Sequence, residues 1–180
     1  MKKFNLMILL IWCYPAWISQ DWFTYEDPGE VFKIEFPGEP MVIDMPAGFG
    51  IDSSKVIQYF PTEDFENAVL TTLTVMYLSE EVLKPELNET SRFEVLENYA
   101  AVTLKMTGEV LESDTISLSG FPGVFIKGRI TQAVNDENYP PVFIKSCLVG
   151  NTIYILKITF SPKQKDLSKM DYFFKSFELH

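Results

Sequence analysis

A chain of 180 residues, of which 47% are hydrophobic and 14% aromatic, can bury enough apolar surface to form one globular domain. Its 25 acidic and 15 basic residues give a formal net charge of −10. Without a basic cluster to neutralise phosphates, the chain is not expected to bind nucleic acid, and an anionic membrane surface is disfavoured for the same reason. The acidity is most simply explained as a solubilising surface.

The first residues are typical of a secretory leader. Lys2 and Lys3 precede an uncharged apolar stretch at residues 4–12. This stretch is shorter than the ~20 residues that a transmembrane helix needs, and Pro15 follows it closely. We therefore expect an exported protein that resides in the periplasm, in the cell envelope or outside the cell, with no transmembrane span in the mature chain.

The end of the leader can be placed in two ways. Cleavage after Ser19 would make residues 1–19 the signal peptide and residues 20–180 a single domain. The alternative is a lipid anchor at Cys13, since a cysteine directly after the apolar run resembles a lipobox. Trp12 argues against that alternative, because the residue before a lipidated cysteine is ordinarily small.

Alternating apolar and charged residues predict the first strand at Phe32–Phe36, and Pro37-Gly38 ends it with a turn. Similar apolar runs rich in β-branched residues predict seven further strands, most of them bounded by turn residues. These strands are expected at Met41–Met45, Lys55–Phe60, Asn67–Leu78, Glu109–Leu118, Val124–Thr131, Val142–Val149 and Thr152–Phe160. Short turns between consecutive strands favour antiparallel pairing.

Two helices are predicted between and after these strands. Ser91 with Glu94 forms a capping box for the first, whose broad apolar stripe indicates a helix that covers a sheet, and Gly108 is a suitable stop. Apolar residues from Leu167 to Phe177 recur at helical spacing and predict the second. The expected fold is α+β, with one antiparallel sheet packed between helices.

Side chains that carry catalysis are scarce. His180 is the single histidine and the last residue, which excludes Ser-His-Asp and Cys-His arrangements and zinc sites of the usual kind. Once the leader is removed, Cys147 is the only thiol, and its apolar neighbours predict a buried hydrophobic role. The segment 119–123 lacks the spacing of a phosphate-binding loop and is predicted to be a β-turn.

Oxygen-rich segments remain as candidates for carboxylate or calcium chemistry. Residues 63–67 and 135–138 each gather several oxygen ligands, but neither has the ligand spacing and central glycine of a calcium loop. Solvated hairpin tips are the simpler interpretation. A carboxylate hydrolase is possible in principle without histidine, yet nothing singles out a pair among the acidic residues. No catalytic, cofactor-binding or metal-binding residue is therefore named, and no cofactor is expected.

Several short motifs resemble the PsbP-like family of exported bacterial domains. They are an opening strand that ends in Phe-Pro-Gly-x-Pro, a turn with two glycines, and a terminal helix that ends in Phe-x-Ser-Phe. The residues concerned are Trp22, Tyr25, Phe32–Pro40, Gly120–Gly123, Tyr154–Leu156 and Phe173–Leu179. The resemblance implies an antiparallel sheet between helices. The leader is similar to those of Bacteroidetes-type exported proteins.

The resemblance also implies a class of function. The better-understood members of the family, the photosystem extrinsic proteins and a nuclear-import regulator that binds a small GTPase, act by binding other proteins. We accordingly expect an exported, non-catalytic domain that binds a protein partner. The alternatives are a small-molecule or lipid carrier with an apolar cavity between sheet and helix, and a carboxylate-based hydrolase.

Overall fold

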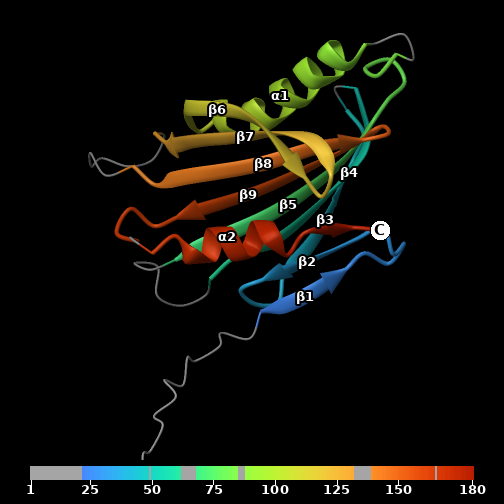
Figure 1. Cartoon of the computed structure of the whole chain (residues 1–180). Helices are drawn as coiled ribbons and strands as arrows, with labels where there is room; N and C mark the ends of the chain where they lie inside the picture. Colours follow the sequence, from blue (N-terminus) through green and yellow to red (C-terminus); the bar gives the residue numbers. More distant parts are fainter. Residues whose placement is uncertain (1–21, 49, 62–67, 85–87, 132–138, 165) are drawn as a thin grey trace, which may run out of the picture.

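The computed structural model describes residues 22–48, 50–61, 68–84, 88–131, 139–164 and 166–180, which form two helices and ten strands (Figure 1). The strands are β1 (Phe23–Glu26), β2 (Phe32–Phe36), β3 (Met41–Met45), β4 (Ile51–Tyr59), β5 (Val69–Leu78), β6 (Gly108–Leu118), β7 (Phe121–Ile130), β8 (Pro141–Val149), β9 (Thr152–Phe160) and β10 (Glu178–Leu179). The helices are α1 (Glu89–Lys105) and α2 (Ser168–Lys175).

Seven of these strands form one large antiparallel sheet in the order β3-β4-β5-β9-β8-β7-β6. Tight hairpins set its register. The β6–β7 turn consists of Ser119 and Gly120, which both have positive φ angles of 49° and 85°. That pair of angles is the signature of the two-residue turn whose twist suits neighbouring strands. The prediction of a β-turn in this segment is confirmed.

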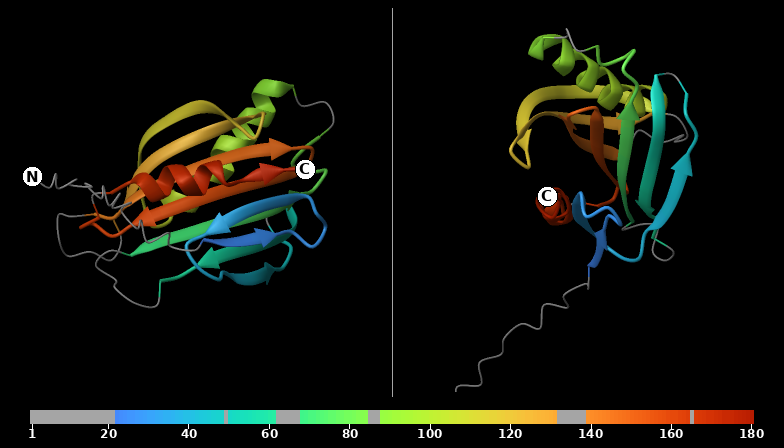
Figure 2. Two further views of the ribbon diagram at one scale, coloured as in Figure 1. Left: turned by 60° about the horizontal axis from the view of Figure 1, so that its bottom comes forward. Right: turned by 90° about the vertical axis from the view of Figure 1, so that its right-hand side faces the viewer.

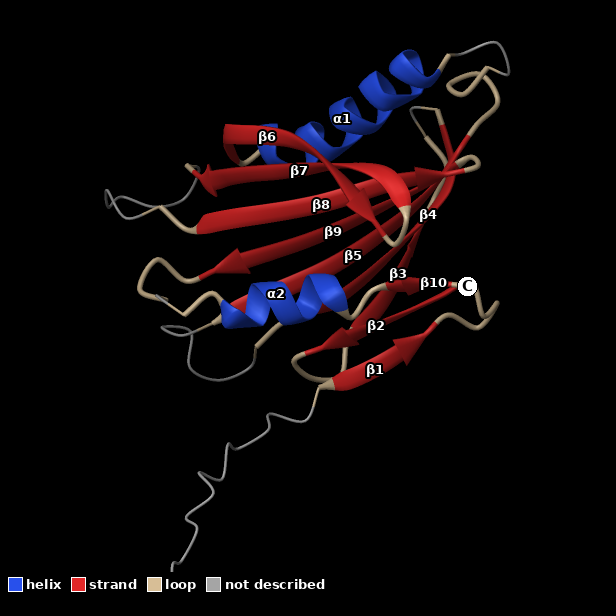
Figure 3. Cartoon of the chain, in the orientation of Figure 1, coloured by secondary structure: helices blue, strands red, loops and turns tan. Residues whose placement is uncertain are grey.

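The two faces of the large sheet are covered by different layers. Helix α1 lies on one face, while α2 and a small sheet of β1, β2 and β10 lie on the other (Figures 2 and 3). Each layer buries its own core. The core beneath α1 includes Leu96, Ala100, Leu104, Ile126 and Ile144. The core on the opposite face is rich in aromatic side chains, including Phe32, Phe36, Phe143, Phe160 and Phe173.

The expectation of a single sheet is wrong for the opening strand. β2 does not join the large sheet but pairs with β1 on one side and β10 on the other. Its apolar residues Phe32, Ile34 and Phe36 alternate as predicted and are all buried against the large sheet. Periodicity correctly identified the buried face of β2, but it carries no information about which strands are its neighbours.

The start of α1 also differs from the prediction. The N-cap is Asn88, whose Oδ1 accepts a hydrogen bond of 2.9 Å from the backbone N–H of Ser91, so the Ser91 capping box is wrong. Asparagine is as good a cap as serine, and the helix therefore begins three residues earlier. Gly108 is not the helix stop but the first residue of β6, where a Cβ atom would lie 2.0 Å from the carbonyl oxygen of Arg129.

An ion pair joins the small sheet to the large one. Lys55 Nζ on β4 lies 3.3 Å from Asp27 Oδ1, just after β1, and the Asp27 side chain is almost fully buried. Burial lowers the pKa of Lys55, but the charge of Tyr25 and the hydrogen bond and charge of Asp27 outweigh it, so the net shift is upward. The pair thus contributes to holding the two sheets together.

Replacing Lys55 with methionine should lower the free energy of unfolding by about 1–3 kcal/mol, because Asp27 would remain buried without its cation. Because the pKa of Lys55 is raised on folding, its contribution is complete below the ordinary value of 10.5 and is lost as pH rises through the raised value. Urea denaturation followed by circular dichroism measures both effects. Lys33→Met is the control: it breaks the exposed Lys33–Glu178 pair and should leave stability unchanged.

Some predictions fall on residues that the structure does not describe. They are the signal peptide at residues 1–19, the lipid-anchor alternative at Cys13, and the oxygen-rich segments 63–67 and 135–138. Neither helix of the described chain is long and apolar enough to cross a membrane.

Candidate binding surface on the large sheet

The most exposed apolar element of the described chain is β3, which forms one edge of the large sheet. Its sequence is Met-Val-Ile-Asp-Met, and all five residues are exposed, Met41 at 54% and Met45 at 48%. Among the described residues β3 pairs only with β4, and neither α1 nor the small sheet buries its side chains. An edge strand with unpaired backbone groups and apolar side chains can accept a further strand.

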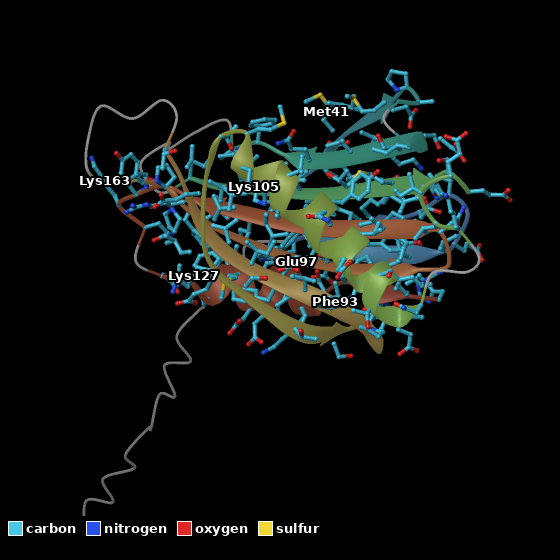
Figure 4. The ribbon with its side chains drawn as sticks, turned by 90° about the horizontal axis from the view of Figure 1, so that it is seen from above. Met41, Phe93, Glu97, Lys105, Lys127 and Lys163 are labelled. Atoms are coloured by element: carbon cyan, nitrogen blue, oxygen red, sulfur yellow. The ribbon has the colours of Figure 1, made fainter. Side chains whose placement is uncertain are left out.

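The register shows which side chains share a face with α1. Met41, Ile43 and Met45 of β3 stand opposite Gln58, Val56 and Ser54 of β4, and the same rows continue into β5. We call this surface the open face. It comprises Met41, Ile43, Met45, Ser54, Val56, Gln58, Thr72 and Thr74. Figure 4 looks down on it, with Met41 at the outer margin of the sheet and α1 crossing in front of the same face.

Helix α1 borders the open face with a second apolar stripe. Val95, Tyr99, Val102 and Met106 recur at helical spacing, and Val102 and Met106 are exposed, the latter at 72%. The core of α1 instead uses Leu96, Ala100, Ala101 and Leu104. The helix is therefore apolar over a wider arc than the sheet beneath it can bury. This exposed apolar surface of α1 predicts that the helix contacts another molecule, or a part of the chain outside the described residues.

A small pocket of about 220 Å³ lies where the open face meets α1. Its lining consists of Val56, Gln58, Thr72, Thr74, Thr103, Ile155 and Lys157. Lys157 on β9 and Thr72 on β5 are directly paired across the two strands. Burial lowers the pKa of Lys157 from its ordinary value, and in the described part of the chain no carboxylate pairs with its ammonium group.

A larger groove of about 480 Å³ lies at the other end of α1, between the helix and strands β6 to β8. Phe93 and Leu96 of α1 form its apolar wall with Pro122 and Leu148. Arg92, which also lines it, donates a hydrogen bond to the carbonyl oxygen of Gly150 in the β8–β9 turn. The groove lies between sheet and helix, where the carrier alternative places a ligand.

The aromatic core on the opposite face is closely packed. Among the described residues its cluster includes several side chains that are fully buried, and ring contacts such as Phe36 with Phe173 at 5.8 Å and Phe143 with Phe160 at 6.0 Å run through it. Cys147 belongs to this cluster, as predicted, and burial raises the pKa of its thiol to about 12. A thiol so far from ionisation at neutral pH is not a nucleophile.

The described residues contain no group of three or more His, Cys, Asp or Glu side chains that could hold a metal ion. His180 lies beside β2, where its backbone N–H donates to the carbonyl oxygen of Val31 at 2.9 Å. The sequence named no site residue. It predicted the β3 strand but not its edge position, and Lys157 went unnoticed although it is the single charged residue in an apolar strand.

No family model matches the sequence, and no curated protein matches it either. Solved structures with a similar fold include the cyanobacterial PsbP (CyanoP) of Synechocystis, with 11% sequence identity, a TM-score of 0.51, and coverage of 88% of this chain and 92% of that one. The chain therefore has a PsbP-like α+β fold, as the sequence motifs indicated.

Two further structures match at a TM-score of 0.45 each. They are the Ran-binding protein Mog1p of Saccharomyces cerevisiae, 13% identical over 88% of this chain and 95% of that one, and LpqN of Mycobacterium tuberculosis, involved in cell envelope biogenesis, 11% identical over 88% and 90%. At this level of similarity neither carries an argument about the present chain.

Proposed function

We propose that this protein is an exported, non-catalytic domain that binds a protein partner through β3 and the open face. The observation that carries the proposal is the exposed apolar edge strand. Soluble proteins usually protect such edges with charges, prolines or a covering segment, because a bare edge pairs with other chains. β3 has one charged residue, Asp44. Because Asp44 alternates with Ile43 and Met45 and pairs with Lys55, its side chain lies on the face of the sheet opposite the open face.

The chemistry of the surface favours an extended peptide segment as the occupant. Backbone groups along β3 can hydrogen-bond to an added strand, while Met41, Ile43 and Met45 offer flexible apolar contacts on alternate positions. The partner strand would lie beside β3, and the adjoining part of the partner would cover the open face as far as Val102 and Met106 on α1. Partner binding of this kind needs neither a cofactor nor a catalytic group.

The charge distribution supports the same location. The chain has a net charge of −10, yet none of the residues that form the open face is acidic. Charged residues are depleted from the centre of protein interfaces because their desolvation is costly. A neutral surface on a strongly acidic protein is therefore the part of it most suited to close contact.

The proposal can be tested by crosslinking in the producing cells. A photoreactive p-benzoylphenylalanine at position 45 should yield a covalent adduct with one other protein, because Met45 would lie against the added strand. The matched control is position 111, since Leu111 is exposed to a similar degree, 50% against 48%, on β6 at the opposite edge of the same sheet. Gel mobility and mass spectrometry identify the adduct.

Three outcomes would contradict the proposal. The first is no adduct at position 45, and the second is the same adduct from positions 45 and 111. The third is an adduct only with a second copy of the chain, which would make β3 a self-association edge. Turnover of a substrate by the purified chain would contradict the non-catalytic part separately.

The carrier function is the second candidate, and the groove between α1 and strands β6 to β8 is the observation that favours it. The groove is lined by Phe93, Leu96, Pro122 and Leu148, which suit an apolar ligand. We place it second because its volume of about 480 Å³ is in the lower half of the usual range for a ligand site.

A further inference from the structure

We propose that the pocket at Lys157 binds a carboxylate group, which Lys157 and Thr72 hold between them. The inference deepens the proposed function by naming a chemical group that the open face recognises. It rests on that function only for the source of the carboxylate, which is an acidic side chain or chain terminus of the partner segment or a free aliphatic acid. The pocket itself stands on four observations.

The first observation is a partly buried cation that makes no ion pair within the described residues. Lys157 lines the pocket on the α1 side of the sheet, and within the described residues its ammonium group makes no ion pair. A charged group away from water is costly unless an opposite charge accompanies it.

The second observation is an unsatisfied hydroxyl beside that lysine. Thr72 is only 5% exposed, and its Oγ1 has no hydrogen-bond partner among the described groups. Buried hydroxyls are normally paired, because an unpaired one costs free energy. Thr103, by contrast, is satisfied, because its Oγ1 donates to the carbonyl oxygen of Ala100 at 2.7 Å. The pocket is therefore lined by a cation that makes no ion pair and by a threonine whose buried hydroxyl has no hydrogen-bond partner among the described groups.

The third observation is the geometry of the two donors. Thr72 and Lys157 are direct partners in the β5–β9 register and point to the same face of the sheet. Side chains paired in this way have Cβ atoms about 4.5–5.5 Å apart. One carboxylate can accept from both, with one oxygen on the hydroxyl and the other on the ammonium group. Gln58 follows in the same row and adds an amide donor at the outer side.

The fourth observation concerns the remaining walls. Val56 and Ile155 lie in the neighbouring row, with Thr74 between them, and supply apolar surface beside the donors, which suits the aliphatic stem of an acid. The pocket holds one cation, whereas phosphate groups are usually met by several cations or by a run of backbone N–H groups. A volume of about 220 Å³ is small for a drug-sized ligand, but it has room for a short acid or for the end of a side chain.

The experiment measures binding of two probes to the purified chain by isothermal titration. Butyrate represents the free acid, and the peptide Thr-Val-Glu-Val-Thr, blocked at both ends, represents an extended partner. Butanamide and the same peptide with glutamine are the uncharged controls. We expect at least one acidic probe to bind, and each uncharged control to bind at least tenfold more weakly. A peptide that binds tenfold better than butyrate assigns the carboxylate to a segment of the partner that covers the open face, and the reverse assigns it to a free acid.

Two variants localise the binding, and a third controls for charge. Lys157→Met should lower the affinity for the acidic probe at least tenfold, and Thr72→Val at least threefold. Lys105 is an exposed lysine in the last turn of α1, and Lys105→Met should change that affinity less than twofold. Neither pocket variant should lower Tm, because each removes a polar group that is unpaired without ligand. If one of them fails to fold, the other still gives the answer.

The inference is overturned if neither acidic probe binds at 50 mM, if the uncharged controls bind equally well, or if the pocket variants bind like wild type. These outcomes are separate from those of the crosslinking experiment. Loss of the adduct at position 45 with intact butyrate binding would remove the partner and leave the pocket. An adduct at position 45 without carboxylate binding would remove the pocket and leave the partner.

Discussion

Replacing Phe36 with alanine should lower the free energy of unfolding by about 3–5 kcal/mol. Phe36 is fully buried at the end of β2, and its ring centroid lies 5.8 Å from that of Phe173 on α2. It therefore joins the small sheet, the second helix and the large sheet in one core. Alanine would leave a cavity that aromatic neighbours, fixed by their own ring contacts, cannot fill without moving whole elements.

Urea denaturation followed by circular dichroism measures this loss. The matched control is Phe60→Ala, since Phe60 follows β4 with 52% of its surface exposed, and its removal should change stability by at most about 0.5 kcal/mol. A loss below about 1 kcal/mol for Phe36→Ala would contradict the packing described. So would equal losses for the two variants.

Replacing Gly128 with alanine should cost about 3 kcal/mol, although it adds a single methyl group. A Cβ at Gly128 on β7 would lie 2.2 Å from Cδ2 of Leu104 on α1 and 2.4 Å from the carbonyl oxygen of Glu109 on β6. The leucine could move, but the carbonyl oxygen belongs to the β6 backbone and is held by strand pairing. The substitution would therefore separate β6 from β7 or lift α1 from the sheet.

Thermal unfolding and hydrogen exchange of the β6–β7 amides would show this separation. Gly48→Ala is the control, because a Cβ there meets no atom within 4 Å, and stability should be unchanged within about 0.5 kcal/mol. If Gly128→Ala were as stable as wild type, the close approach of α1 to β7 would be refuted. A loss in both variants would point instead to a general cost of replacing glycine.

Most of the fold could be predicted from local patterns. The strands from Met41 onward and both helices have the residue types and periods that their structures require, and the Gly150-Asn151 turn joins β8 and β9 as predicted. What local patterns could not supply was pairing. β1 was missed because the four residues Phe23–Glu26 are too few to show a period, and β10 because it has two. Both pair with β2, which the local pattern of β1 or β10 does not reveal.

The candidate binding surface was harder to predict, for a related reason. The pattern of Met41–Met45 predicts a strand but not whether that strand lies at the edge or in the centre of a sheet. The strand order shows that it lies at an edge. Likewise, the broad apolar stripe of α1 indicated a helix that covers a sheet, but the sequence does not reveal how wide that sheet is. Val102 and Met106 are in fact exposed. One signal was available. Lys157 interrupts the run Thr152–Phe160, which is apolar on both faces and thus belongs at the centre of a sheet.

The position of Lys157 in β9 has a consequence for how a ligand would be detected. All residues of β9 except Lys157 are buried, and the strand is hydrogen-bonded to β5 on one side and to β8 on the other. Its amide protons therefore exchange with solvent only when the whole sheet opens, and not by fraying of a loop. A carboxylate bound to the native state alone stabilises it by RT ln(1 + [L]/Kd) against that opening. Occupancy of so small a pocket should consequently slow exchange across the central strands together, by a common factor equal to 1 + [L]/Kd.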